Sequence, residues 1–85
     1  MHDILQIQEK IRHFIVKTSY VEDEQVNPKT LIFEQGIMDS MGFMSLITFI
    51  EESFSIQAKD NELLEANFES VDAIASFVLK KLNHN

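Results

Sequence analysis

Apolar residues at helical spacing in three long segments constrain the fold of this chain more than any other feature. Near the N-terminus they recur at steps of three or four residues, with polar residues between them: Ile4, Ile7, Ile11 and Phe14. This spacing places the apolar side chains on one face of a helix. It therefore predicts an amphipathic helix over residues 3–17.

Two later segments show the same pattern and predict two more helices. The first covers Ser40 to Phe54, and the second runs from about Ser70, a candidate N-cap, to Leu82. The side chains predicted to be buried are Phe43, Leu46, Ile47, Ile50 and Phe54 in the first and Val71, Ile74, Ala75, Val78 and Leu82 in the second. We expect Phe77 at the edge of the second buried stripe.

The connection between the first two of these helices, residues 18–39, is unusually long. Asn27-Pro28 and Gly36 disfavour a long helix there. The segment also contains apolar residues such as Ile32 and Phe33. A loop of this length and composition should pack against the core.

A further helix, the third along the chain, is expected to be short. The apolar pair Leu63-Leu64 lies in residues 62–65 and follows Asp60 and Asn61, which are candidate caps, so one or two turns are predicted here. The sequence as a whole predicts an all-α four-helix bundle with a long first loop and a short third helix. At 85 residues, we expect a single domain that spans residues 1–85.

Composition and charge exclude several classes of protein. Fourteen acidic against seven basic residues give a formal net charge of -7, which repels nucleic-acid phosphates, so we expect no nucleic-acid partner. The absence of Cys excludes disulfides and thiolate metal ligands. Residues 22–72 hold twelve acids against Lys29 and Lys59, either as a solvated surface or as a contact for basic partner proteins.

Nothing in the sequence suggests a membrane segment. The N-terminus lacks the pattern of a signal peptide, and no apolar stretch is long enough to span a bilayer. We therefore expect a soluble, cytoplasmic protein without a membrane partner.

A serine stands at the predicted start of the second long helix, in the segment Gly36-Ile37-Met38-Asp39-Ser40-Met41. The free amide groups and the helix dipole at such a position favour a negative charge nearby. The simplest interpretation is that Asp39 or Ser40 is an ordinary N-cap. Taken alone, an Asp-Ser pair at a helix start does not distinguish a site for a negatively charged group from an ordinary N-cap.

The same segment resembles the attachment motif of the acyl carrier protein family, in which a Gly-x-Asp-Ser-(Leu or Met) run opens the second helix. Here one extra residue lies between Gly36 and Asp39. The resemblance covers nearly the whole chain, because the order and length of the predicted elements also match. It implies that Ser40 carries a 4'-phosphopantetheine arm derived from coenzyme A, and that Asp39 helps to hold the metal and cofactor during the transfer.

The resemblance also implies a function and a set of partners. The arm would hold an acyl or aminoacyl group as a thioester and deliver it to other enzymes, in a specialised biosynthetic pathway. Implied partners are a phosphopantetheinyl transferase, adenylating, ligase or acyltransferase enzymes, and downstream tailoring or condensing enzymes. We expect the carrier itself to be a monomer and not an enzyme.

The second long helix also offers a candidate partner surface. Five residues are predicted to face away from the core: Met41, Met44, Thr48, Glu51 and Glu52. Isolated exposed apolar residues are common and need no function. Two Met residues bordered by carboxylates are also typical of an adaptable docking patch. In the resembling family this helix is the main recognition element.

Three positions depart from fatty-acid carriers. Fatty-acid carriers often have acids at the positions of Gly42 and Ser45, and they usually have a smaller residue at the position of Phe43. The Phe43 ring could fill the space that a long acyl chain needs. The sequence is therefore more similar to aminoacyl carriers, such as D-alanyl carriers, or to peptidyl carriers, and predicts a small or polar cargo.

The main alternative is a helical interaction module with the same fold that carries nothing. An enzyme has little support, because a serine nucleophile needs a base within hydrogen-bond reach. The three candidates, His2, His13 and His84, belong to the terminal segments and are expected on the surface.

Overall fold

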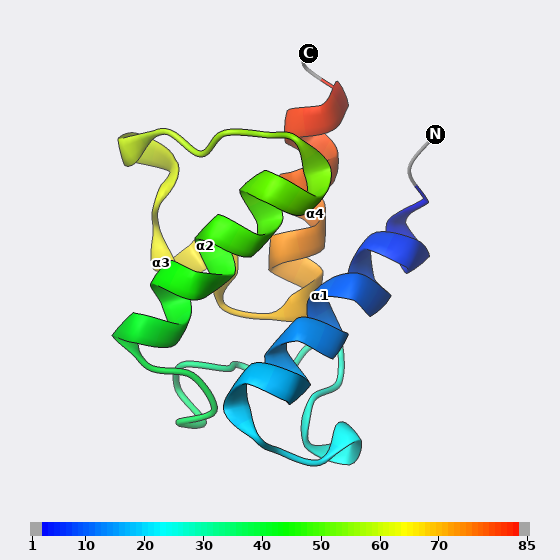
Figure 1. Cartoon of the computed structure of the whole chain (residues 1–85), viewed down its shortest axis with the longest axis vertical. Coiled ribbons are helices and arrows are strands. Elements are labelled where there is room, and N and C mark those ends of the chain that lie inside the picture. Colours follow the sequence, from blue (N-terminus) through cyan, green and yellow to red (C-terminus); the bar gives the residue numbers. More distant parts are fainter. Residues whose placement is uncertain (1–2, 84–85) are drawn as a thin grey trace.

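The computed structural model describes residues 3–83, which form helices and connecting loops without a strand. In chain order the elements are α1 (Ile4–Ser19), the 3-10 turn η1 (Asp23–Gln25), α2 (Ser40–Phe54), the 3-10 turn η2 (Asp60–Glu62), α3 (Glu65–Phe68) and α4 (Val71–Asn83). Figure 1 shows α1 running in the opposite direction to α2 and α4. The predicted all-α bundle with a long first loop and a short third helix is confirmed. None of the helices in residues 3–83 is long and apolar enough to cross a membrane.

Helix α2 has the bounds that the sequence predicts. The residue before it, Asp39, is extended and accepts a hydrogen bond from the Gly42 N–H, while Ser55 ends the helix in the left-handed conformation, with φ of 55°. Helix α1 begins after a similar cap, Asp3, and continues to Ser19, two residues beyond the predicted end. Local capping groups therefore set the position of both helices.

The core forms where α1, α2 and α4 meet. The residues predicted to be buried in α2 and α4 are buried, except for Phe43 and Leu82, which are only partly covered. Phe77, expected at the edge of its stripe, is buried and lies 5.0 Å from Phe68 between ring centroids. Ser70 caps α4 as predicted, because its hydroxyl accepts a hydrogen bond from the backbone of the third residue of that helix.

The third helix lies further along the chain than the sequence predicts. Residues 60–62 form the short turn η2, Leu63 and Leu64 are not helical, and α3 starts only at Glu65. The reason is tertiary packing, since Phe68 is fully buried whereas Leu64 is 58% exposed. Burying one large ring stabilises the fold more than burying a half-covered pair of Leu residues in an isolated turn.

An ion pair holds the η2 segment against the last turn of α4. The carboxylate of Glu62 accepts hydrogen bonds from the Lys59 N–H at 2.8 Å and from Lys81 Nζ at 2.9 Å. The backbone hydrogen bond from Lys59, followed by the bond to Lys81, keeps the pKa of Glu62 below its ordinary value. The side chain of Asn67 in α3 also donates to the Glu62 carbonyl, so Glu62 connects α3 to α4.

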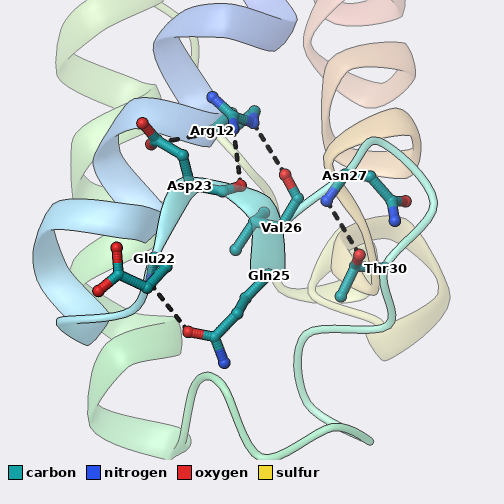
Figure 2. Close-up of polar contacts among 7 residues, drawn as sticks. All are labelled: Arg12, Glu22, Asp23, Gln25, Val26, Asn27 and Thr30. Carbon is teal, nitrogen blue, oxygen red and sulfur yellow. Dashed lines mark hydrogen bonds and ion pairs between the residues drawn. The ribbon is translucent and has the colours of Figure 1, made fainter.

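Arg12 anchors the long first loop to α1, as Figure 2 shows. Its guanidinium donates to the Val26 carbonyl at 2.8 Å and to the Asp23 carbonyl at 2.7 Å, and it lies 3.8 Å from the Asp23 carboxylate. Val26 is itself 1% exposed. The loop is thus a packed part of the molecule, as the sequence predicts, and it brings residues 31–39 back toward α2.

We expect Arg12→Ala to lower the free energy of unfolding by about 2 kcal/mol, because two backbone carbonyls lose a charged donor. Urea denaturation monitored by circular dichroism would measure the change. Lys17→Ala is a suitable control, since Lys17 lies on the same helix and forms no ion pair in residues 3–83. The control should cost less than about 1 kcal/mol, and equal losses in the two variants would contradict the anchoring role.

Candidate functional site

Ser40 is the first residue of α2 and is exposed. Asp39 precedes it in extended backbone and uses one carboxylate oxygen, Oδ1, to accept the Gly42 N–H at 2.9 Å. The cap satisfies one free amide of the first helical turn, and the Ser40 hydroxyl stands beside the amides that remain. An anion bonded to that hydroxyl would lie at the positive end of the helix dipole.

The backbone of Ile32 positions the turn that leads to Ser40. Its carbonyl accepts hydrogen bonds from the N–H groups of Ile37, at 2.9 Å, and Met38, at 3.1 Å, while its own N–H donates to the Glu69 carbonyl at 2.9 Å. Gly36 closes the turn with φ of 73°, a conformation that other residues rarely adopt. The candidate site is therefore connected to the junction between α3 and α4.

Gly42 lets the Met38 side chain pass close to the start of α2. A β-carbon added to Gly42 would lie 2.6 Å from Met38 Cγ, which is closer than real contacts allow. Met38 is only 5% exposed, so its side chain has little freedom to move away. In the sequence Gly42 stands out only because an acid is frequent at this position in fatty-acid carriers, and its close packing against Met38 is seen only in the structure.

An open hollow of about 640 Å³ lies beside Ser40. Its lining consists of Phe33, Gly36, Met38, Asp39, Ser40, Phe43, Leu63 and Glu65. Phe43 separates this hollow from the core, with its ring 5.6 Å from that of Phe33 and 5.4 Å from that of Phe68 between centroids. Sequence patterns do not assign Leu63 and Glu65 to the site, because no spacing signal relates them to Ser40.

The surface of α2 agrees only in part with the expected pattern. Met41 and Met44 are 79% and 62% exposed, and Thr48 and Glu52 are also exposed. Glu51, in contrast, is half-buried, and its carboxylate accepts the Ala58 N–H at 2.9 Å. Glu51 therefore has a structural role in holding the loop after α2, which the helical pattern did not predict.

No His and no metal-binding cluster accompanies Ser40 in the described residues. His13 is exposed on α1 and does not line the hollow beside Ser40, whereas His2 and His84 lie outside the described residues. Residues 3–83 also contain no group of three or more His, Cys, Asp or Glu side chains that could hold a metal ion.

The site lies within a region that matches a known protein family. A family model described as a phosphopantetheine attachment site matches residues 9–78. The match includes most of α1, the whole of α2 and α3, and more than half of α4. A search of individual curated proteins found no match.

The contact between Gly42 and Met38 predicts that the effect of Gly42→Ala on the free energy of unfolding changes sign when Met38 is also replaced. Gly42→Ala should destabilise the protein, because overpacking of about 1–3 kcal/mol exceeds the gain in helix propensity of up to about 1 kcal/mol. In a Met38→Ala background the same substitution should be stabilising, since the clash is absent. Urea denaturation of the four proteins in the cycle would measure both effects, and additive changes would contradict the proposed contact.

Proposed function

Because the chain belongs to the phosphopantetheine attachment family, we propose that Ser40 is the residue that carries the arm. The observation that supports this choice is that Ser40 is both exposed and at the N-terminus of a long helix. Ser70 also begins a helix, but it is buried and caps α4. Ser45 lies inside α2, and Ser55 lies at its C-terminus, where the helix dipole disfavours a phosphate.

The surroundings of Ser40 suit such a group. The hydroxyl lies at the edge of the hollow, and a β-carbon added to Gly36 on its rim would have no atom within 4 Å, so there is room for a chain to leave the protein surface. In the attachment, the Ser40 oxygen would bond to the pantetheine-side phosphorus of coenzyme A, and the nucleotide part would leave. The serine proton would pass to a base that the transferase provides.

Asp39 would have two tasks during this transfer. Its Oδ1 caps α2, and its other carboxylate oxygen has no hydrogen-bond partner within the described residues. That second oxygen is free to help hold a metal ion and the cofactor phosphates, for which a hard oxygen donor is suited. Because the cap fixes the Asp39 side chain, its carboxylate charge stays next to Ser40.

The proposed role is that of a carrier, a single domain over residues 1–85 that acts as a cytoplasmic monomer and is not itself an enzyme. When attached, the arm supplies a terminal thiol to which an acyl or aminoacyl group is bound as a thioester. The carrier holds this cargo close to partner enzymes, and the exposed surface of Met41, Met44, Thr48 and Glu52 would contact them. Those partners would be a transferase, a loading enzyme and enzymes that use the cargo.

We further propose that the cargo is small or polar. Phe43 contacts Phe33 and Phe68 edge-on, and Phe68 contacts Phe77, so aromatic rings occupy the path from the hollow to α4. A long acyl chain would have to displace a ring from this packed series, at a cost. A short acyl or amino acid could remain in the open hollow or outside it.

The attachment proposal predicts a mass increase of one phosphopantetheine after incubation with coenzyme A, Mg²⁺ and a broad-specificity transferase. Ser40→Ala should abolish the increase, whereas Ser45→Ala, another exposed serine of α2, should keep it. Asp39→Asn should preserve stability, because Asn is an equally good N-cap, but slow the loading. Intact-mass measurement over time distinguishes these variants. An unmodified wild-type protein would instead support the non-carrier interaction module.

The cargo proposal predicts that Phe43 controls the response to acyl chain length. The wild-type protein loaded with an octanoyl group should be no more stable to urea than the protein loaded with an acetyl group. In Phe43→Ala the octanoyl form should be more stable than the acetyl form by about 1–3 kcal/mol, because each buried methylene contributes about 0.8 kcal/mol. Phe49→Ala is the control, since Phe49 does not line the hollow. Octanoyl stabilisation of the wild type would contradict the proposal.

A further inference from the structure

The seam between α1 and α2 carries two adjoining hollows, separate from the one beside Ser40. Their volumes are about 410 and 450 Å³. Both are lined by Phe14 of α1 and Phe49 of α2, so this aromatic pair forms the ridge between them. Figure 1 shows α1 and α2 next to each other on the same side of the molecule.

The two rings are stacked and incompletely covered. Their centroids are 4.3 Å apart with an angle of 16° between the planes, and both residues are only half-buried. The exposed Met44 lines the hollow on the α2 side. A group of incompletely covered apolar side chains with polar residues around it is a feature of sites that bind another molecule.

The α1 wall of the seam is basic, although the chain as a whole has a formal net charge of -7. Lys10, His13 and Lys17 line this wall. Neither lysine forms an ion pair within residues 3–83, whereas Arg12 of the same helix pairs with Asp23. Glu52 of α2 is the acid that lines the opposite wall. Positive charge without an acidic partner is therefore concentrated along α1.

We propose that this seam is a docking surface for a partner protein that presents an acidic helix with an apolar residue at its centre. The apolar side chain would cover Phe14 and Phe49, and the carboxylates would pair with Lys10 and Lys17. The charge complementarity would set the orientation, because Glu52 repels acids from the α2 wall. The proposal goes beyond the carrier role and does not depend on the modification of Ser40.

The spacing of the lysines specifies the partner further. Lys10 and Lys17 are seven residues apart, or two helical turns, which corresponds to about 10 Å along α1. Phe14 lies between them. Lys10 Nζ lies 5.7 Å from the centroid of the Phe54 ring, a contact that does not neutralise its charge. A helix packed alongside would therefore match this wall with two acids two turns apart and an apolar residue about halfway between them.

The test uses a short capped helical peptide with two Glu residues two turns apart and a Phe midway, added to the isotope-labelled protein. Nuclear magnetic resonance should show saturable shifts confined to α1 and α2 around Phe14 and Phe49. Lys10→Glu combined with Lys17→Glu should weaken binding about tenfold, because two exposed ion pairs become repulsive. A peptide with Lys in place of both Glu should not bind.

The matched control is Lys59→Glu combined with Lys80→Glu, which makes the same charge change beside a different hollow, between η2 and α4. This control should change the peptide affinity less than about twofold. If both double variants weaken binding equally, the effect is one of net charge and the docking proposal is wrong. Absence of saturable binding, or shifts centred elsewhere, would also overturn it.

Two further arms keep the outcomes distinct. If circular dichroism shows that the Lys10→Glu, Lys17→Glu variant does not fold, Lys10→Gln combined with Lys17→Gln replaces it. This variant should lose peptide affinity by about threefold. Ser40→Ala should bind the peptide like the wild type, so failure of the attachment proposal would leave this result unchanged. Anionic phospholipid vesicles are tested in parallel, and binding to vesicles without binding to the peptide would replace the protein partner with a membrane surface.

Discussion

The backbone hydrogen bonds of Ile32 are the contacts on which the arrangement around Ser40 depends. They close the turn before Asp39 and attach it to the Glu69 carbonyl, close to the start of α4. Because Ile32 is fully buried, these bonds are shielded from water and hold the turn in one position. Arg12 and the hydrogen bond from the Asp72 N–H to the Pro28 carbonyl hold the earlier part of the loop, and the Ile32 bonds hold the part that leads directly into α2.

Signals that lie close together in the sequence were sufficient to predict the three long helices and the cap of α2. The sequence gives Asp39 and Ser40 as the two candidate caps, and the structure shows that Asp39 is the cap. The spacing of Leu46, Ile50 and Phe54 also depends only on near neighbours, and all three are buried as predicted. The third helix was misplaced because its position depends on the burial of Phe68 among side chains distant in sequence. A helix of one turn has little stability of its own, so tertiary packing determines where it forms.

Interactions between side chains and distant backbone groups could not be predicted for the same reason. The helical pattern placed Glu51 on the outer face of α2, but the pattern does not contain the Ala58 N–H that its carboxylate accepts. Arg12 likewise is an ordinary polar residue of an amphipathic helix until the loop brings two carbonyls to its guanidinium. In both residues the backbone of a loop provides the partner, and loop conformation is the least regular part of the fold.

The distribution of charge adds a constraint on how the proposed carrier would meet its partners. Acids predominate in residues 22–72, whereas the α1 wall beside Phe14 presents Lys10 and Lys17 without acidic partners in the described residues. Helix α2 belongs to the acidic segment and packs against the basic wall of α1 through the stacked rings of Phe14 and Phe49. A partner that covers both α2 and the seam would therefore meet the carboxylate of Glu52 on α2 and the two lysines on α1. A uniformly basic surface would be attracted at one edge and repelled at the other, which would fix its orientation relative to Ser40.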